Sequence, residues 1–146
     1  MRKQAVDDAV RLPDEQLELY KKGYEAEKMA ASNLAHKKRI EKPVESAEKE
    51  LESAKQKLHP LFIDIPVLKP VNDMMTELNR LAEKVKDTKS AMDEAKRSVK
   101  WANTRQLLNE RKALVESATK AYRVTKKRHD ALEARLKPVL KRLSSL

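Results

Sequence analysis

The side chains that could carry out catalysis or bind a metal are few and lie far apart in the sequence. The chain has no cysteine, and its three histidines, His36, His59 and His129, have no paired carboxylates at the spacing of a metal site. A nucleophile beside a base is absent, as is the glycine-rich loop that binds phosphate groups. We therefore expect a protein that is not an enzyme, with no catalytic residue, metal, cofactor or small-molecule substrate.

Apolar side chains gather in one stretch near the middle of the chain, residues 59–71, which is better suited to binding. It holds three of the six prolines, the only phenylalanine and seven large apolar residues. Exposed apolar clusters often form interaction surfaces, and prolines lower the entropy lost on binding. The alternative is that these side chains fold over the ends of the neighbouring helices and cover them. The residues predicted to contact a partner are Pro60, Leu61, Phe62, Ile63, Ile65, Pro66, Val67, Leu68 and Lys69.

Positive charge gathers in the second half of the chain. The net charge is +10, and residues 73–146 carry nineteen basic and ten acidic side chains, whereas residues 14–58 carry ten of each. Such a surplus favours binding to nucleic acid or to an anionic membrane surface. The alternative is a helix face that is only solvated. The residues predicted to contact an anionic partner are Arg123, Lys126, Lys127, Arg128, Arg135 and Lys137.

Two long helical segments flank the apolar stretch. With 38% charged and 3% aromatic residues, the composition is typical of coiled coils and long helices. In residues 14–58 apolar side chains recur three and four apart, and Pro43 predicts a kink near 41–43. The members of this apolar stripe are Leu17, Tyr20, Tyr24, Ala31 and Leu34 before the kink and Val44, Ala47, Leu51, Ala54 and Leu58 after it. In residues 72–146 two seven-residue series differ in phase: one starts at Leu78 with a companion series from Leu81, and the other starts at Leu108 and is joined by Ala118, Leu132 and Val139. We expect a register shift between them, with Trp101 packed at the shift.

The sequence thus predicts an all-α fold, a long antiparallel two-helix coiled-coil hairpin with a proline-rich apolar tip at residues 59–71. Residues 1–13 are expected to be an N-terminal extension or linker. The second arm, 72–146, is longer than the first, so its basic end overhangs and needs a partner: the N-terminal segment, another subunit or a further domain. The hairpin closes within a monomer or between the chains of a homodimer. No run of about 18 apolar residues is present that could span a membrane.

Three stretches carry a resemblance to a known family: residues 15–20 with 50–58 in the first arm, the pair His59–Pro60 at the tip, and the Ala- and Lys-rich residues 85–96. Together they resemble the receptor-binding domain of the E-group nuclease colicins, a helical hairpin whose tip docks on an outer-membrane receptor. Residues 8–13 resemble the tail of a preceding translocation domain. The resemblance implies a bacteriocin module whose residues 60–71 contact a protein receptor, such as an outer-membrane protein. The location is extracellular in that case and cytoplasmic otherwise.

We therefore expect a protein–protein binding module in which the helical hairpin is a spacer and the apolar tip recognises a receptor. One alternative is a structural coiled-coil stalk or adaptor subunit of a larger assembly, similar to the two-helix stalk proteins of secretion ATPases. Another is a basic helical module that binds nucleic acid or an anionic membrane. In the stalk alternative the long basic arm makes the contacts and the tip is dispensable, whereas dimerisation and salt dependence are diagnostic of the nucleic-acid or membrane alternative.

Overall fold

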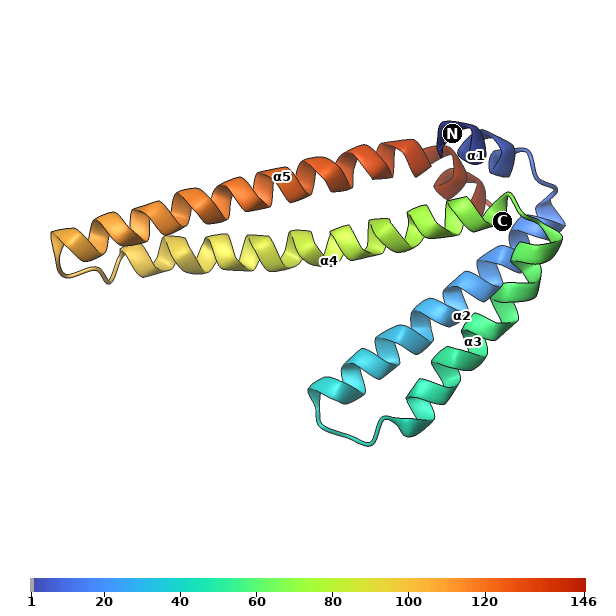
Figure 1. The fold of residues 1–146 in the computed structure, drawn as a ribbon, viewed down its shortest axis with the longest axis horizontal. Coiled ribbons are helices and arrows are strands. Elements are labelled where there is room, and N and C mark those ends of the chain that lie inside the picture. The colour runs from blue at the N-terminus through green and yellow to red at the C-terminus, as the bar shows by residue number, and fades with distance from the viewer. Residues whose placement is uncertain (1) are drawn as a thin grey trace. The chain divides into compact units, whose positions relative to one another are not determined.

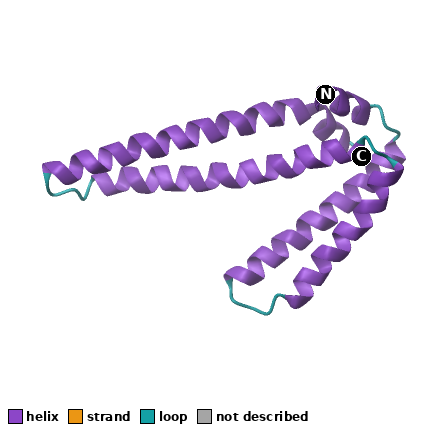
Figure 2. Ribbon diagram, in the orientation of Figure 1, coloured by secondary structure: helices purple, strands orange, loops and turns teal. Residues whose placement is uncertain are grey.

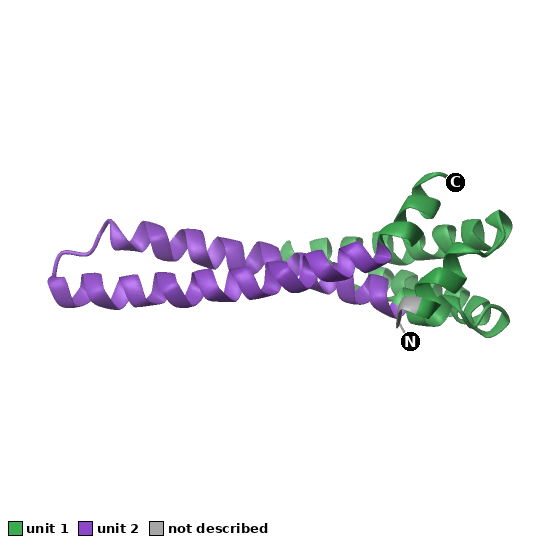
Figure 3. Cartoon of the chain, turned by 90° about the horizontal axis from the view of Figure 1, so that it is seen from above, with its two compact units in different colours: residues 1–72, 137–146 green, residues 73–136 purple. Residues whose placement is uncertain are grey.

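The computed structural model describes residues 2–146, and this part of the chain is all-helical, as predicted (Figure 2). Within these residues there are five helices (Figure 1): α1 (Arg2–Val10), α2 (Asp14–Arg39), α3 (Glu45–Asp64), α4 (Leu68–Val99) and α5 (Arg105–Ser144). They form two compact units (Figure 3), residues 1–72 with 137–146 (unit 1) and residues 73–136 (unit 2). The finer prediction of one two-helix hairpin with a proline-rich tip is not confirmed, because each unit contains a helical hairpin of its own.

The first reversal of the chain lies at residues 40–44, where the sequence predicted a kink within one arm. α2 ends in a Schellman motif: the Lys42 N–H donates to the Lys37 carbonyl at 3.0 Å and the Glu41 N–H to the Lys38 carbonyl at 3.3 Å. Glu41 takes the left-handed conformation, with φ 56°. Pro43 then cannot continue a helix without losing a hydrogen bond. The chain turns back, and α3 runs beside α2 in the opposite direction (Figure 1).

The predicted tip, 59–71, is mostly helical. α3 continues through Pro60 to Asp64, and the Ile65 N–H donates to the Leu61 carbonyl at 2.8 Å. Helix is interrupted only at residues 65–67, and Pro70 falls in the first turn of α4, where proline is tolerated. Pro60 gives up one backbone hydrogen bond, but the helix that continues beyond it carries the half-buried Leu61 and Phe62 and leads to the buried Ile65. Apolar burial outweighs the lost bond here.

Unit 1 has its core along the facing sides of α2 and α3. The predicted stripe residues Leu17, Tyr20, Ala47 and Leu58 are all buried. Further along α2, Tyr24 and Leu34 of the predicted stripe are half-buried, but Ala31 is exposed and its neighbour Ala30 is half-buried instead.

The C-terminal end of α5 belongs to the same unit as the N-terminal segment. Val139 and Leu143 are buried, and the Arg142 guanidinium donates to the Leu12 carbonyl at 3.2 Å and to Asp14 Oδ1 at 2.6 Å. The last residues of α5, 137–146, therefore have the N-terminal segment as their partner, whereas the preceding part of α5 lies with α4 in unit 2, so the overhang predicted for a single hairpin is not confirmed. Pro138 lies inside α5 and does not end it.

Unit 2 is a second antiparallel hairpin, formed by α4 from residue 73 and α5 up to residue 136 (Figures 1 and 3). Burial follows both predicted seven-residue series, with Leu81, Met92, Leu132 and Leu136 buried and the intervening series positions half-buried. The two series differ in phase because they lie on different helices, joined by residues 100–104. The prediction that Trp101 packs at a register shift is wrong: its side chain is 80% exposed in this turn.

Candidate functional site: a groove beside the α3–α4 corner

The residues predicted to contact a partner are divided between core and surface at the corner where α3 meets α4. Ile65 and Leu68 are buried, which gives them the covering role that the sequence left as an alternative. Leu61, Phe62 and Val67 are half-buried, whereas Ile63 is 66% exposed. The remaining exposed members of the set are Pro60, Pro66 and Lys69.

An aromatic cluster fixes this corner within unit 1. The Phe62 ring lies 6.3 Å from the Tyr20 ring, centroid to centroid, and Tyr20 stacks on Tyr24 at 5.9 Å. Tyr20 is completely buried, and its hydroxyl donates a hydrogen bond to Asn72 Oδ1 at 2.9 Å. Aromatic pairs of this kind stabilise by about 0.5–1.5 kcal/mol beyond their buried area. The first residues of α4 are thereby tied to the second turn of α2.

A groove of about 420 Å³ lies beside the cluster. Its lining is apolar at Leu58, Phe62 and Ile63. It is charged or polar at Lys55 and His59, which stand one turn apart on the same side of α3 and form part of its rim. The Lys69 ammonium lies 5.7 Å from the centre of the Phe62 ring, within the range of a cation–π contact. The rest of the rim is Glu27 and Asn72. Such a surface suits an apolar side chain carried by a segment that also bears negative charge.

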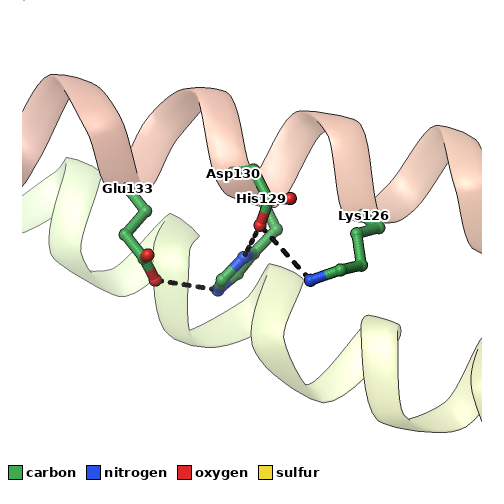
Figure 4. A network of polar contacts seen from close by, with 4 residues as sticks. All are labelled: Lys126, His129, Asp130 and Glu133. Carbon is green, nitrogen blue, oxygen red and sulfur yellow. Dashed lines mark hydrogen bonds and ion pairs between the residues drawn. The ribbon is translucent and has the colours of Figure 1, made fainter.

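The basic run of α5 is solvated and partly paired. Lys126 lies 3.5 Å from Asp130, whose carboxylate also contacts His129 Nδ1 at 3.0 Å (Figure 4). The hydrogen bond from His129 holds the pKa of Asp130 below its usual value, and the charge of Lys126 adds to the effect. His129 Nε2 is also 3.7 Å from Glu133. The other predicted contacts, Arg123, Lys127, Arg128, Arg135 and Lys137, are all exposed.

No protein-family model, curated protein or solved structure matches this chain. The resemblance to colicin receptor-binding domains therefore stays a prediction from sequence. Within residues 2–146 no helix is both long enough and apolar enough to cross a membrane.

Sequence reasoning missed the turn between α4 and α5 as a possible site. The Thr104 hydroxyl caps α5 by accepting a hydrogen bond from the Leu107 N–H at 3.1 Å. Arg111 caps α4 by donating to the Ser98 carbonyl at 2.5 Å. A signal was present, since a threonine cap lies between two apolar series of different phase, and this combination is typical of a turn between helices.

Proposed function

We propose that this protein is a non-catalytic protein-binding module in which paired helices form the scaffold and the α3–α4 corner groove recognises a segment of a protein partner. The observation that carries the proposal is the position of Ile63, which is 66% exposed in the groove, whereas Leu58, which lines the same groove, is buried. An aliphatic side chain held in this way can act as an anchor, because burying it on binding removes apolar surface from water.

Preorganisation supports the same proposal. Phe62 and Asn72 are both held by Tyr20, so little conformational entropy is lost when a partner docks on the groove. Lys55 and Lys69 at the rim favour a partner segment with acidic residues. A receptor at the outer membrane is the partner that the colicin resemblance suggests.

We also propose that the paired helices of each unit pack as an antiparallel coiled coil. Burial along α5 recurs at alternating steps of three and four residues, as in Leu132, Leu136, Val139 and Leu143. The scaffold then acts as a spacer, which is the role that the sequence predicted for its arms.

The substitution Ile63→Ser tests the groove. We expect it to weaken binding of the partner at least tenfold, because a central anchor typically contributes about 2 kcal/mol or more. The partner is first captured by cross-linking to the intact chain from outer-membrane and cytosolic extracts, and is then purified so that affinity can be measured by calorimetry. Leu19→Ser is the matched control, since Leu19 is 57% exposed on α2 in the same unit but does not line the groove.

Equal affinities of the two variants for the partner contradict the proposal. Loss of helicity in Ile63→Ser, measured by circular dichroism, contradicts it as well, because the side chain then has a structural role. The stalk or adaptor alternative predicts that Ile63→Ser binds normally and that substitutions in the basic run of α5 disrupt binding.

A further inference from the structure

The turn between α4 and α5, residues 100–104, carries the most exposed large apolar side chain that the structure describes. Trp101 is 80% exposed, and no aromatic ring or apolar cluster of residues 2–146 covers it. A tryptophan in water is unfavourable, since the indole is largely apolar and has a single N–H donor. Its position belongs to unit 2 and plays no part in the corner groove.

Unpaired positive charge surrounds this tryptophan in the sequence. Lys96, Arg97, Lys100 and Arg105 are exposed, and residues 95–109 contain no aspartate or glutamate. None of these four side chains makes an ion pair or a side-chain hydrogen bond within residues 2–146. The end of the hairpin therefore presents one indole and four free cations.

The turn is well formed. Arg111 caps α4, Thr104 caps α5, and backbone hydrogen bonds continue from the Lys100 N–H to the Arg97 carbonyl at 3.2 Å and from the Trp101 N–H to the Ser98 carbonyl at 3.3 Å. Trp101 is thus held outside by a hydrogen-bonded turn, and its exposure does not result from an unformed loop. A preordered turn loses little entropy on docking.

We propose that this turn docks peripherally on a bilayer that contains anionic lipid, with Trp101 at the level of the headgroups and the four cations above it. Tryptophan prefers the membrane–water interface, and each Lys or Arg near an anionic surface adds to the attraction. Because the four cations are not held in place, they suit a diffuse negative surface better than directional recognition by an acidic protein.

Nucleic acid fits this turn less well. Two adjacent helices, each about 10–12 Å across, are too wide for a major groove of about 12 Å. Proteins that bind single strands stack successive bases on several aromatic side chains. In unit 2 the only other aromatic residue is Tyr122, which is half-buried in the stripe between the helices.

Trp101 is the single tryptophan of the sequence, so the fluorescence of the full chain reports directly on the surroundings of this turn. Vesicles of equal parts phosphatidylserine and phosphatidylcholine are expected to shift the Trp101 emission to the blue, and vesicles of phosphatidylcholine alone are not. Raising the salt concentration reverses the shift, because surface charges more than about 10 Å apart are screened at moderate salt. A single-stranded oligonucleotide is expected to leave the emission unchanged.

Two variants separate the turn from the total charge. Replacing Lys96, Arg97, Lys100 and Arg105 with Gln should lower the vesicle partition coefficient, measured by co-sedimentation, by roughly two to three orders of magnitude, because each cation contributes about fivefold. Trp101→Ala should reduce it by roughly tenfold. The control replaces Lys120, Arg123, Lys127 and Arg128 with Gln, which removes the same charge elsewhere on α5.

The proposal is overturned if anionic vesicles cause no blue shift, if the control quartet loses binding as strongly as the turn quartet, or if only the oligonucleotide shifts the emission. These outcomes are distinct from failure of the corner groove, which Ile63→Ser tests in the other unit.

Discussion

Gly23 shows how one residue sets the distance between two helices. It lies inside α2, where glycine is less favourable than alanine by about 1 kcal/mol, and its φ is not in the left-handed region. A Cβ at this position would overlap the Leu58 side chain on α3. Leu58 is 2% exposed, so it has little room to move. The glycine is needed here because the helices approach closely.

We expect Gly23→Ala to lower the free energy of unfolding by about 1 kcal/mol, since overpacking of about 1–3 kcal/mol exceeds the gain in helix propensity. Ser32→Ala, at an exposed position of the same helix, should instead raise it by a few tenths, to about 0.5 kcal/mol. Urea unfolding followed by circular dichroism measures both. A stabilised Gly23→Ala variant would show that Leu58 repacks freely.

Asp130 provides a prediction about pH. Its pKa is lowered chiefly by the hydrogen bond from His129, with a smaller effect of Lys126. A lowered pKa in the folded state stabilises the fold above the ordinary carboxylate value of about 4, and this contribution is lost as the pH falls through the folded value. In a carbon NMR titration, His129→Ala should return the Asp130 midpoint toward the ordinary value, and Lys126→Ala should move it less. Equal movements in the two variants would contradict this order of causes.

At the scale of elements, a proline predicted the place of a chain reversal less well than the apolar stripes predicted burial. Pro43 and Pro66 lie in breaks between helices, but Pro60 and Pro138 lie inside α3 and α5. A proline in a helix loses one hydrogen bond and introduces a clash, and whether the helix ends there depends on the burial gained beyond it. The chain also reverses at residues 100–104, between the end of α4 and the beginning of α5, and no proline lies there.

The apolar stripes were a stronger signal. The series through Leu78 and through Leu108 both correspond to reduced exposure, and Ala47 and Leu58 of the first arm are buried as predicted. This success has a local cause, because a helix places residues three and four apart on one side whatever its partner is. Which helix each stripe packs against could not be predicted in the same way, because it depends on where the chain turns.

At the scale of the whole molecule, the chain ends contribute to a core far away in sequence. Leu143, near the C-terminus, is buried in the same unit as Val6 and Leu17, although more than a hundred residues separate it from them. Unit 1 is therefore completed only when the end of α5 joins it.

Leu143→Ala should destabilise unit 1 by about 2–5 kcal/mol, the usual range for a buried leucine. Hydrogen exchange should show reduced protection in α1 and α2. Leu19→Ala, at an exposed position of the same unit, should change stability by no more than about 0.5 kcal/mol. Similar protection patterns in the two variants would mean that the C-terminal residues are not part of this core.

The amino-acid sequence by itself determined that the chain is helical, which side of each helix is apolar and where the positive charge lies, because propensity, periodicity and composition are local properties. Only the tertiary structure decided that the helices form two hairpins, that Ile65 and Leu68 are covered while Ile63 stays exposed, and that Trp101 faces solvent. Those outcomes depend on which apolar surfaces meet, and the free energy of that burial comes from residues distant in sequence.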